Sequence, residues 1–382
     1  LTTDIIAYTV NHIPKWNPLN ICSYHLQEAG ATPEQELAFA LSTAIAVLDT
    51  VKASGQIPDD EFDKVVGRIS FFVNAGVRFI EEICKMRAFG ILWDEITRDR
   101  YGVTDPKMRR LRYGVQVNSL GLTEAQPENN VQRIVLEMLG VTLSKSARAR
   151  AVQLPAWNEA LGLPRPWDQQ WSLRLQQVLA YESDLLEYED IFDGSHVIEA
   201  KTAELIAHAK AEIEQIDQMG GAIAAVESGY MKQALVASHA HRRASIESGE
   251  ITVVGVNAFT ETEPSPLTAD LDTAIQIADP QAEANAIAAL EKWRAARDEA
   301  AVGAALERLA QDAKTSVKLM GATLDAVRAG ATVGEWSQVL REVFGEYRAP
   351  TGVSGVVGVA GDDVSAIRER VRATGVALGG RL

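Results

Sequence analysis

Four short apolar segments, each followed by a polar loop or a long amphipathic pattern, constrain the fold of this chain most strongly. The predicted strands are residues 19–24, 68–73, 112–117 and 151–154, and the helices between them cover residues 33–54, 75–100 and 127–143. In the first helix apolar side chains recur at intervals of three and four, as at Leu37, Leu41, Ala44 and Leu48. Strands that alternate with helices form right-handed crossovers in a parallel sheet. We therefore predict an α/β fold.

Four strands are half of an eight-stranded (β/α)8 TIM barrel, and such a half leaves two unpaired sheet edges. We predict that residues 1–165 form the second, C-terminal half of a barrel, and that the missing half lies upstream or in another chain. The chain begins with Leu1 rather than Met and enters at once into a helical pattern over residues 4–10. This start also suggests a fragment.

The pattern changes after the barrel half, and residues 166–348 are predicted to be an extended helical region packed on it. The expected helices cover residues 167–186, 197–218, 230–248, 280–299, 303–329 and 332–344. Glycines at positions 220, 221, 249 and 330 serve as stop signals. Residues 251–256 are strand-like, and residues 260–269 form a polar loop. Residues 349–382 are predicted to be a linker with a short helix at 364–373.

Composition narrows the class of protein. The net charge of -15 argues against nucleic acid or an anionic membrane as the main partner, although a few local basic residues can still bind an anionic substrate. The two cysteines cannot make a disulfide framework, which favours a reducing cytoplasm. No apolar run approaches the roughly 18 residues that a membrane span needs, and no signal peptide precedes the first element.

The first candidate site is the sequence Tyr24-His25-Leu26-Gln27-Glu28-Ala29-Gly30, which follows the first predicted strand. After it, Thr32-Pro33-Glu34-Gln35 has the form of a helix start with a capping box. Strand ends of this kind carry the chemistry in barrel enzymes. The His25 imidazole can stabilise charge on a carbonyl oxygen, although by itself a histidine after a strand is more often structural. The alternatives for Glu28 are a solvated loop carboxylate, or a carboxylate favourably placed near a helix N-terminus.

The second motif, Arg68-Ile69-Ser70-Phe71-Phe72, alternates, so that Arg68, Ser70 and Phe72 share one face of a strand. Arg68 and Ser70 can donate hydrogen bonds to the amides of a ligand such as a phosphopantetheine arm, and the Phe72 ring can pack against its alkyl chain. The alternative is a strand with one snorkelling arginine.

Two further motifs follow later strands: Arg112-Tyr113-Gly114-Val115-Gln116, and Asn158-Glu159-Ala160-Leu161. Between them, Asn129 and Asn130 open a helix and are interpreted as capping residues. Taken alone, neither Gln116 nor Glu159 indicates a function.

Together, these four motifs resemble the methylmalonyl-CoA mutase family of adenosylcobalamin-dependent acyl-CoA mutases, and the resemblance extends to about residue 350. It is closest to the ethylmalonyl-CoA mutase branch. The resemblance implies a radical carbon-skeleton isomerase that exchanges a hydrogen and a CoA-thioester carbonyl group between adjacent carbons. It also implies a homodimer and a G-protein reactivation chaperone as partners.

The resemblance assigns a role to each matching residue. His25 contacts the thioester carbonyl, and Tyr24 lies against the substrate. CoA is lined by Arg68, Ser70 and Phe72. The adenosyl ribose is bound by Glu28 and Glu159, and Gln116 lies at the corrin and adenosyl side.

The family binds cobalamin through a separate domain whose Asp-x-His-x-x-Gly motif supplies the cobalt ligand, and this motif is missing from the sequence. No metal ligand is therefore assigned in this chain. His239 and His241 are two apart on a predicted helix and cannot share a metal ion. The glycines at 352, 355, 358 and 361 indicate a flexible linker and not a phosphate-binding loop.

Two departures from methylmalonyl enzymes favour ethylmalonyl-CoA and methylsuccinyl-CoA as the substrate pair. Leu120 stands where those enzymes usually have tryptophan, and residues 189–196 differ from their usual Asp-Pro and Gly-Gly-Ser pattern. Methylmalonyl-CoA and succinyl-CoA are the alternative pair. A different class of function, a non-catalytic CoA-binding or scaffold fragment, also stays open, and the fragment alone is expected to be inactive.

Overall fold

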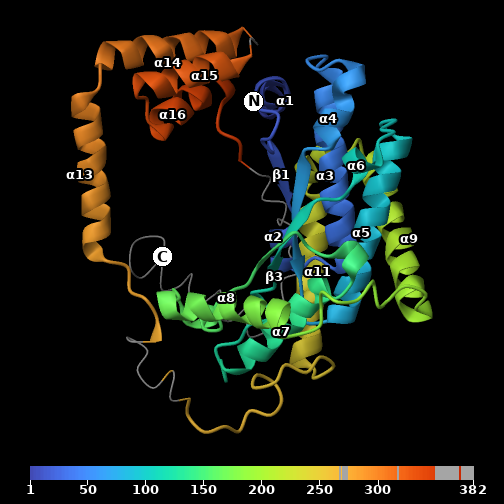
Figure 1. Cartoon of the computed structure of the whole chain (residues 1–382). Helices are drawn as coiled ribbons and strands as arrows, with labels where there is room; N and C mark the ends of the chain where they lie inside the picture. Colours follow the sequence, from blue (N-terminus) through green and yellow to red (C-terminus); the bar gives the residue numbers. More distant parts are fainter. Residues whose placement is uncertain (266–267, 269–273, 316–317, 349–369, 371–382) are drawn as a thin grey trace.

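The computed structural model describes residues 1–265, 268, 274–315, 318–348 and 370, and a parallel sheet is at its centre (Figure 1). Four strands lie in the order β1-β2-β3-β4. Their bounds are β1 Leu19–Cys22, β2 Ile69–Ala75, β3 Tyr113–Val117 and β4 Ala151–Gln153. Each strand is parallel to its neighbour and follows it in the sequence. The predicted α/β fold is confirmed, and consecutive parallel strands of this kind are the arrangement of half a (β/α)8 barrel.

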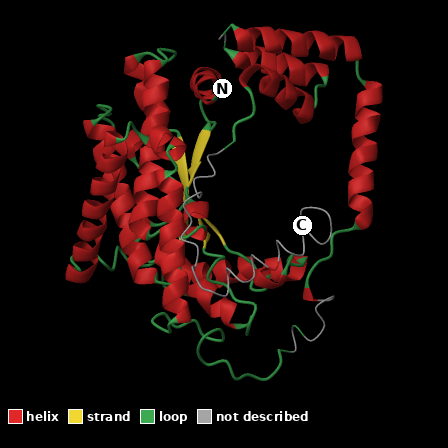
Figure 2. Cartoon of the chain, turned by 180° about the vertical axis from the view of Figure 1, so that it is seen from behind, coloured by secondary structure: helices red, strands yellow, loops and turns green. Residues whose placement is uncertain are grey.

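Helices cover one face of this sheet (Figures 1 and 2). They are α1 Thr2–His12, α3 Pro33–Ala53, α5 Phe79–Asp99 and α7 Asn129–Thr142, with α9 His196–Gln218 packed across α3 and α5. Short helices lie between them: α2 Tyr24–Glu28, α4 Phe62–Val66 and α6 Pro106–Arg109. The core is aromatic at its centre, where the Phe71 ring lies 4.8 Å from Phe89 and 5.0 Å from Trp93.

The other face of the sheet carries smaller and more polar side chains. Along β2, Ile69, Phe71 and Val73 are buried, whereas Ser70 and Phe72 are half-buried on the opposite face. Phe72 lies between Cys22 and Gly114 in register. A Cβ atom at Gly114 would lie 2.9 Å from the Phe72 ring, so that glycine makes room for the ring. This face corresponds to the interior of a barrel.

Most of the other elements in the described part of the chain are helices. The remaining helices are α8 Pro166–Tyr181, α10 Ala222–Glu227, α11 Tyr230–Glu247, α13 Pro280–Ala296, α14 Glu299–Lys314, α15 Leu319–Ala329 and α16 Val333–Phe344. Helices α14 to α16 share a small apolar core around Leu309 and Leu319, and α13 leads to them (Figure 1). Within the described part of the chain, no helix is long and apolar enough to cross a bilayer.

Local signals in the sequence were accurate at the helix starts and stops. The Thr32 side chain accepts a hydrogen bond from the Gln35 amide, and the Gln35 side chain accepts one from the Thr32 amide, which completes the predicted capping box. The glycines predicted as stop signals at 220, 221, 249 and 330 all have positive φ. Apart from residue 370, the predicted linker at 349–382, with its short helix at 364–373, lies outside the described residues.

Three predictions about elements were wrong. The first strand ends at Cys22, and Tyr24 begins a short helix, because the Ser23 amide makes the last bond to the Phe72 carbonyl. Residues 251–256 form a loop in which the Asn257 side chain binds the backbone of Ile246, Ile251 and Val253.

The third wrong prediction is the single helix over residues 303–329, which is two helices, α14 and α15. Helix α14 ends where the Thr315 hydroxyl donates to the Gln311 carbonyl. The reversal of the chain lets Leu309 and Leu319 pack into one core, which a continuous helix would prevent.

We expect Phe71→Ala to lower the free energy of unfolding by about 3–5 kcal/mol, because it removes a ring packed between two others in a site that cannot collapse. Urea denaturation followed by circular dichroism measures the change. Tyr181→Ala is the control, because that side chain is 83% exposed. Equal losses in the two variants would contradict the assignment of the core.

Candidate functional site

Three aromatic side chains meet just after the end of β1, beside Phe72 of β2. The Tyr24 ring lies 4.6 Å from the His25 ring and 5.4 Å from the Phe72 ring, with edge-to-face geometry in both pairs. Tyr24 and Phe72 are half-buried, whereas His25 is exposed. The imidazole of His25 is thus presented to solvent at the carboxyl-terminal edge of the sheet, next to an apolar wall. This is the edge where parallel barrels carry their active sites.

Glu28 ties the end of α2 to the two neighbouring strands. Its Oε1 accepts hydrogen bonds from the Asn74 side chain at 3.1 Å and the Ser119 amide at 2.8 Å. Its Oε2 accepts one from the Leu120 amide at 2.9 Å. Asn74 belongs to β2, and Ser119 and Leu120 follow β3. Glu28 therefore bridges three consecutive strand ends and is not the solvated loop carboxylate of the alternative interpretation.

A fully buried lysine lies directly beneath this edge. The Lys85 ammonium is 2.6 Å from the Glu36 carboxylate and 2.6 Å from the Glu82 carboxylate, and all three side chains are at most 3% exposed. It also donates to the Gln27 side chain at 2.9 Å and to the Asn74 carbonyl at 2.8 Å. One cation from α5 thus binds groups from α2, α3 and β2.

The two carboxylates extend the network to the backbone of the site. Glu36 accepts from the Ser23 hydroxyl and the Asn74 amide, both at 2.9 Å. Glu82 accepts from the Gln27 side chain at 3.1 Å and the Gly76 amide at 3.0 Å. The residues on both sides of Tyr24 and His25 are therefore anchored to buried charges.

The ionisation of the network follows from its geometry. Burial opposes the charge on Lys85, but Glu36 and Glu82 outweigh it and raise the pKa of the ammonium above its ordinary value. Burial raises the pKa of the Glu36 carboxyl, and the neighbouring ammonium lowers it only in part. Lys85 is therefore the fixed positive charge of the network.

A third buried acid, Glu137, lies at the same edge. Glu137 in α7 is fully buried, and neither of its carboxyl oxygens has a hydrogen-bond partner among the described residues. Burial, with smaller effects from Glu82 and Glu28, raises the pKa of Glu137 to about 9. It lines a cavity of about 340 Å³ together with Asn118, Leu120 and Gly121. At neutral pH, Glu137 is thus a protonated, neutral acid at the carboxyl-terminal edge.

The predicted CoA-lining residues lie along β2, away from His25. Arg68 immediately precedes the strand, and its guanidinium donates to the Thr9 carbonyl at 3.3 Å. The Ser70 hydroxyl accepts from the Asn17 side chain at 2.6 Å. Only Phe72 of this set contacts the aromatic cluster at the carboxyl end.

The last two predicted site residues, Gln116 and Glu159, have polar groups that are available to bind a ligand. Gln116 lies in register with Asn74 and Gln153, one row above Phe72 on the interior face. Glu159 begins the short 3-10 helix Glu159–Leu161 after β4. Neither side chain has a hydrogen bond to another described residue, and both are half-buried. Gln116 and Glu159 thus offer an amide and a carboxylate that have no hydrogen-bond partner among the described residues.

The network around Lys85 was missed at the sequence level. A usable signal was present, because Glu82 and Lys85 are three apart on a helix face that also carries buried Ile83, Met86 and Phe89. Glu36 lies in the first turn of α3, where a carboxylate also has an ordinary favourable dipole interaction. Its pairing with Lys85 depends on two helices meeting, and this cannot be read from local sequence.

His239 and His241, which the sequence analysis excluded as a metal pair, have different surroundings. His239 packs against Gly30, whereas His241 lines the 340 Å³ cavity.

Comparison with known proteins shows the family of the chain. Residues 1–346 match the model of the methylmalonyl-CoA mutase family. The chain belongs to this family. It is 62% identical over 379 residues to the ethylmalonyl-CoA mutase of Cereibacter sphaeroides, which covers 99% of the chain and 57% of that protein. It is 62% identical over 354 residues to the ethylmalonyl-CoA mutase of Methylorubrum extorquens, covering 93% of the chain and 51% of that protein.

Methylmalonyl-CoA mutases are less similar. The protein of that name from Cereibacter sphaeroides is 37% identical over 367 residues, which are 95% of the chain and 50% of that protein. The chain thus spans about half the length of the curated relatives it matches.

We expect Lys85→Met to lower the free energy of unfolding by about 3–5 kcal/mol, because it leaves two buried carboxylates without their cation. Lys64→Met is a matched control. Lys64 also lies 2.6 Å from a carboxylate, but its side chain is 43% exposed, and exposed pairs contribute less than about 1 kcal/mol. Chemical denaturation compares the two. A similar small loss in both would refute the role of Lys85.

Glu137 should make the protein less stable as pH rises. Its pKa in the folded state, about 9, is above the ordinary value of 4.5, so the folded state binds more protons than the unfolded state between those pH values. As pH rises through this range, Glu137 therefore lowers the free energy of unfolding by up to about 1.4 kcal/mol per pH unit.

Glu137→Gln removes the titrating group, so the stability of the variant relative to wild type should increase steadily from pH 5 to pH 9. Denaturation curves across that range measure the difference. The exposed Glu182 provides the control Glu182→Gln, whose profile should stay parallel to that of wild type. A constant difference between Glu137→Gln and wild type would contradict a protonated Glu137.

Proposed function

We propose that this chain supplies the C-terminal half of the substrate barrel of an adenosylcobalamin-dependent mutase that interconverts ethylmalonyl-CoA and methylsuccinyl-CoA. The observation that carries the proposal is the 62% identity to two ethylmalonyl-CoA mutases, against 37% for a methylmalonyl-CoA mutase. The clustering of Tyr24, His25 and Phe72 at one strand edge supports it. The other half of the barrel and the cobalamin domain come from segments outside the matched half.

In this proposal, His25 hydrogen-bonds the thioester carbonyl and stabilises charge on its oxygen as the carbonyl group migrates. The exposed imidazole has no hydrogen bond to another described residue, so both ring nitrogens are available. Tyr24 and Phe72 form the wall that holds the acyl group. Lys85 binds the Gln27 side chain, and its partner Glu36 binds the Ser23 hydroxyl. These contacts hold the chain on both sides of Tyr24 and His25, so the imidazole needs little reorganisation to act.

Adenosylcobalamin would supply the radical that abstracts a substrate hydrogen. The residues present fit its adenosyl ribose in part. Gln116 and Glu159 offer an amide and a carboxylate that make no hydrogen bonds within the described part of the chain. Glu28 already accepts three hydrogen bonds, so one of its lone pairs is left for a ribose hydroxyl. We propose that Glu28 mainly positions this edge and that Glu159 makes the stronger ribose contact.

The CoA carrier would enter along the interior face of β2, past Arg68 and Ser70. Both side chains now bind protein groups, Thr9 and Asn17, which hold them beside this route. We also propose a cytoplasmic homodimer that is served by a G-protein reactivation chaperone.

The preference for the larger acyl group rests on Leu120. Its side chain is 38% exposed and lines the 340 Å³ cavity, and its amide holds Glu28. The second sequence difference, residues 189–196, is less informative. There, Asp190 accepts hydrogen bonds from Ser144 and Ser146, which lead into β4 at the opposite edge of the sheet. Methylmalonyl-CoA is the alternative substrate, and a non-catalytic CoA-binding scaffold is the alternative class.

A chimera tests the proposal. The chain replaces its 379 matched residues in the ethylmalonyl-CoA mutase of Cereibacter sphaeroides, and the product is assayed with adenosylcobalamin and each acyl-CoA. We expect turnover of ethylmalonyl-CoA to exceed that of methylmalonyl-CoA by at least tenfold. The reverse preference would favour the alternative substrate. A folded chimera that binds CoA without turnover would favour the scaffold.

In the same chimera, His25→Ala should lower kcat by about 10²–10³-fold, the usual cost of losing one donor to a developing oxyanion. Binding of adenosylcobalamin, followed by its absorbance, should stay near normal. His208→Ala, on α9, is the control and should leave kcat unchanged. Unchanged turnover in His25→Ala would refute the role of the imidazole.

A further inference from the structure

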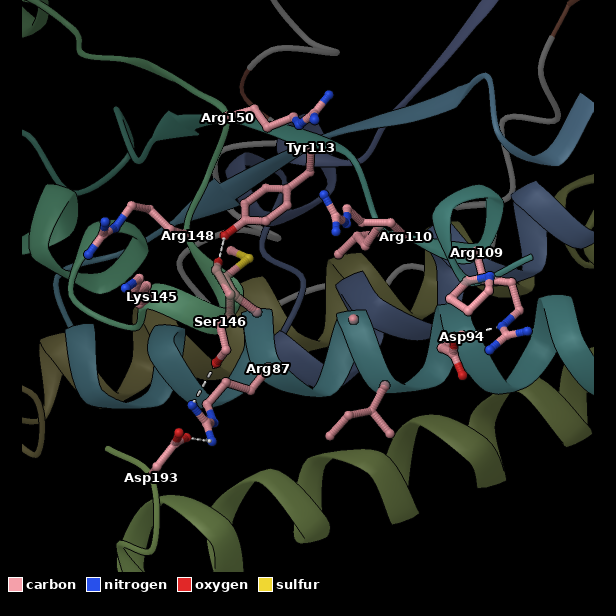
Figure 3. Close-up of a pocket in the computed structure, with 16 residues that line it drawn as sticks. Arg87, Asp94, Arg109, Arg110, Tyr113, Lys145, Ser146, Arg148, Arg150 and Asp193 are labelled. Carbon is pink, nitrogen blue, oxygen red and sulfur yellow. Dashed lines mark hydrogen bonds and ion pairs between the residues drawn. The ribbon is translucent and has the colours of Figure 1, made fainter. Parts of the chain in front are cut away.

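Acids are paired with cations at one end of the sheet, and one acid is unpaired at the other. The cleft at the amino-terminal end, drawn in Figure 3, is lined by Arg87, Arg109, Arg110, Lys145, Arg148 and Arg150. In it, Asp94 lies 2.8 Å from Arg109. Asp193 lies 3.2 Å from Arg87, so both acids of this cleft have partners. At the carboxyl-terminal end, the buried carboxyl group of Glu137 has no hydrogen-bond partner among the described residues.

The close packing of α7 on α5 determines where Glu137 lies. Gly140 is three residues further along α7, and a Cβ atom there would lie 3.1 Å from the Glu82 Cβ. The two helices therefore meet with little space between them. On the other side, Oε1 of Glu137 lies 3.5 Å from the position of a Cβ atom on Gly121. The carboxyl group thus reaches the turn at residues 118–121, which follows β3.

This turn is joined to α2 through Glu28. The Glu28 carboxylate accepts hydrogen bonds from the Ser119 amide at 2.8 Å and the Leu120 amide at 2.9 Å. Within the turn, the Asn118 side chain accepts from the Gly121 amide at 3.2 Å. The Ser119 hydroxyl is buried and has no hydrogen-bond partner in the described part of the chain. The position of Leu120 relative to α2 therefore depends on the two amides that bind Glu28.

The nearest charged groups oppose ionisation of Glu137. Burial has the largest effect on its pKa, and Glu82 and Glu28 raise the pKa further. Arg133, on the same helix, lowers the pKa by less. The Arg133 guanidinium donates to the Thr123 hydroxyl at 2.7 Å and does not bond to Glu137.

Cations on the other surrounding elements do not reach Glu137 either. His241 and Arg242 of α11 line the same 340 Å³ cavity, but both are exposed. Arg78, also on its wall, pairs with Glu81 at 2.9 Å. Lys85 is already bound by two other carboxylates. A negative charge on Glu137 would therefore be without a bonded cation in the described structure.

We propose that Glu137 is a positioning residue for the candidate site: as a neutral acid it supports the turn at residues 118–121, and its ionisation releases that turn from Glu28. A buried carboxylate without a cation needs water around it, so the cavity must open. The new charge would also repel Glu28, the group that holds the turn. The turn can yield because Leu120 is 38% exposed, whereas Glu82 on the opposite wall is held by Lys85 and the Gly76 amide.

The consequence for catalysis rests on the proposed function, in which Leu120 sets the acyl preference and Glu28 lies at the adenosyl ribose. While Glu137 is neutral, both residues stay in place. When pH rises through the pKa of Glu137, the turn is released and the site loses its geometry. Activity should therefore be present below that pKa and fall above it.

Hydrogen exchange of the full 382-residue chain, measured by rapid-quench mass spectrometry at pH 7 and pH 10, tests the proposal. With a pKa of about 9, Glu137 is almost wholly neutral at pH 7 and is ionised roughly ten to one at pH 10. We expect the Ser119 and Leu120 amides to exchange about tenfold faster in wild type than in Glu137→Gln at pH 10, and at equal rates at pH 7. Comparison at one pH cancels the chemical dependence of exchange on pH.

Two further variants and an internal reference complete the test. Glu137→Leu, a second variant that cannot ionise, should behave like Glu137→Gln, whereas Glu182→Gln, at an exposed position, should behave like wild type. In wild type, exchange of the turn relative to that of β2 should rise from pH 7 to pH 10. The proposal is overturned if wild type and Glu137→Gln exchange alike at pH 10, or if the turn and β2 accelerate together, which would mean unfolding of the whole chain.

The chimera described above separates this inference from the proposed function. At pH 9.5 about one quarter of the Glu137 side chains are still neutral, so kcat/KM for ethylmalonyl-CoA in wild type relative to Glu137→Gln should fall about fourfold from pH 7. A ratio that does not change in an active chimera would overturn the positioning role. An inactive chimera would count against the proposed function, and the exchange experiment would still decide the role of Glu137.

Discussion

The buried charge of Lys85 is the interaction on which the candidate site depends. Its ammonium joins α5 to Glu36 of α3, to Gln27 of α2 and to the backbone of β2. Removing a lysine from water is costly, and here the cost is offset by two carboxylates and two further acceptors. The same contacts fix the ends of two strands. The short helix that presents Tyr24 and His25 is therefore supported from below by charge and not only by apolar packing.

The sheet has two unlike faces, and this difference organises the molecule. One face packs Phe71 against Phe89 and Trp93 and forms the core. The other face carries Ser70, Phe72 and Gln116, which are half-buried and suited to line a ligand route. Both faces come from the alternation of side chains along the same strands. The apolar face gives stability, and the polar face is available for binding.

Charge is also divided between the two ends of the sheet. At the carboxyl-terminal end, Glu36 and Glu82 pair with Lys85. Glu137 is buried near Glu82 and Glu28, and burial followed by these two acids raises its pKa. At the amino-terminal end, arginines gather with few acids. The polarity of the sheet is therefore electrostatic as well as geometric.

Local sequence determined much of this protein. Apolar periodicity located the strands and helices, Thr32 and Gln35 marked a helix start, and four motifs gave the family. These features depend on neighbours in the chain, whose spacing fixes their geometry. Tertiary structure alone decided the rest: the partners of Lys85, the neutral state of Glu137, the use of Glu28 as a bridge and the grouping of Arg110 with Arg150. Each of these features depends on burial or on charges that belong to distant segments of the chain. Burial and neighbouring charges set the free energy of an ionised group, and the position of the group in the sequence does not.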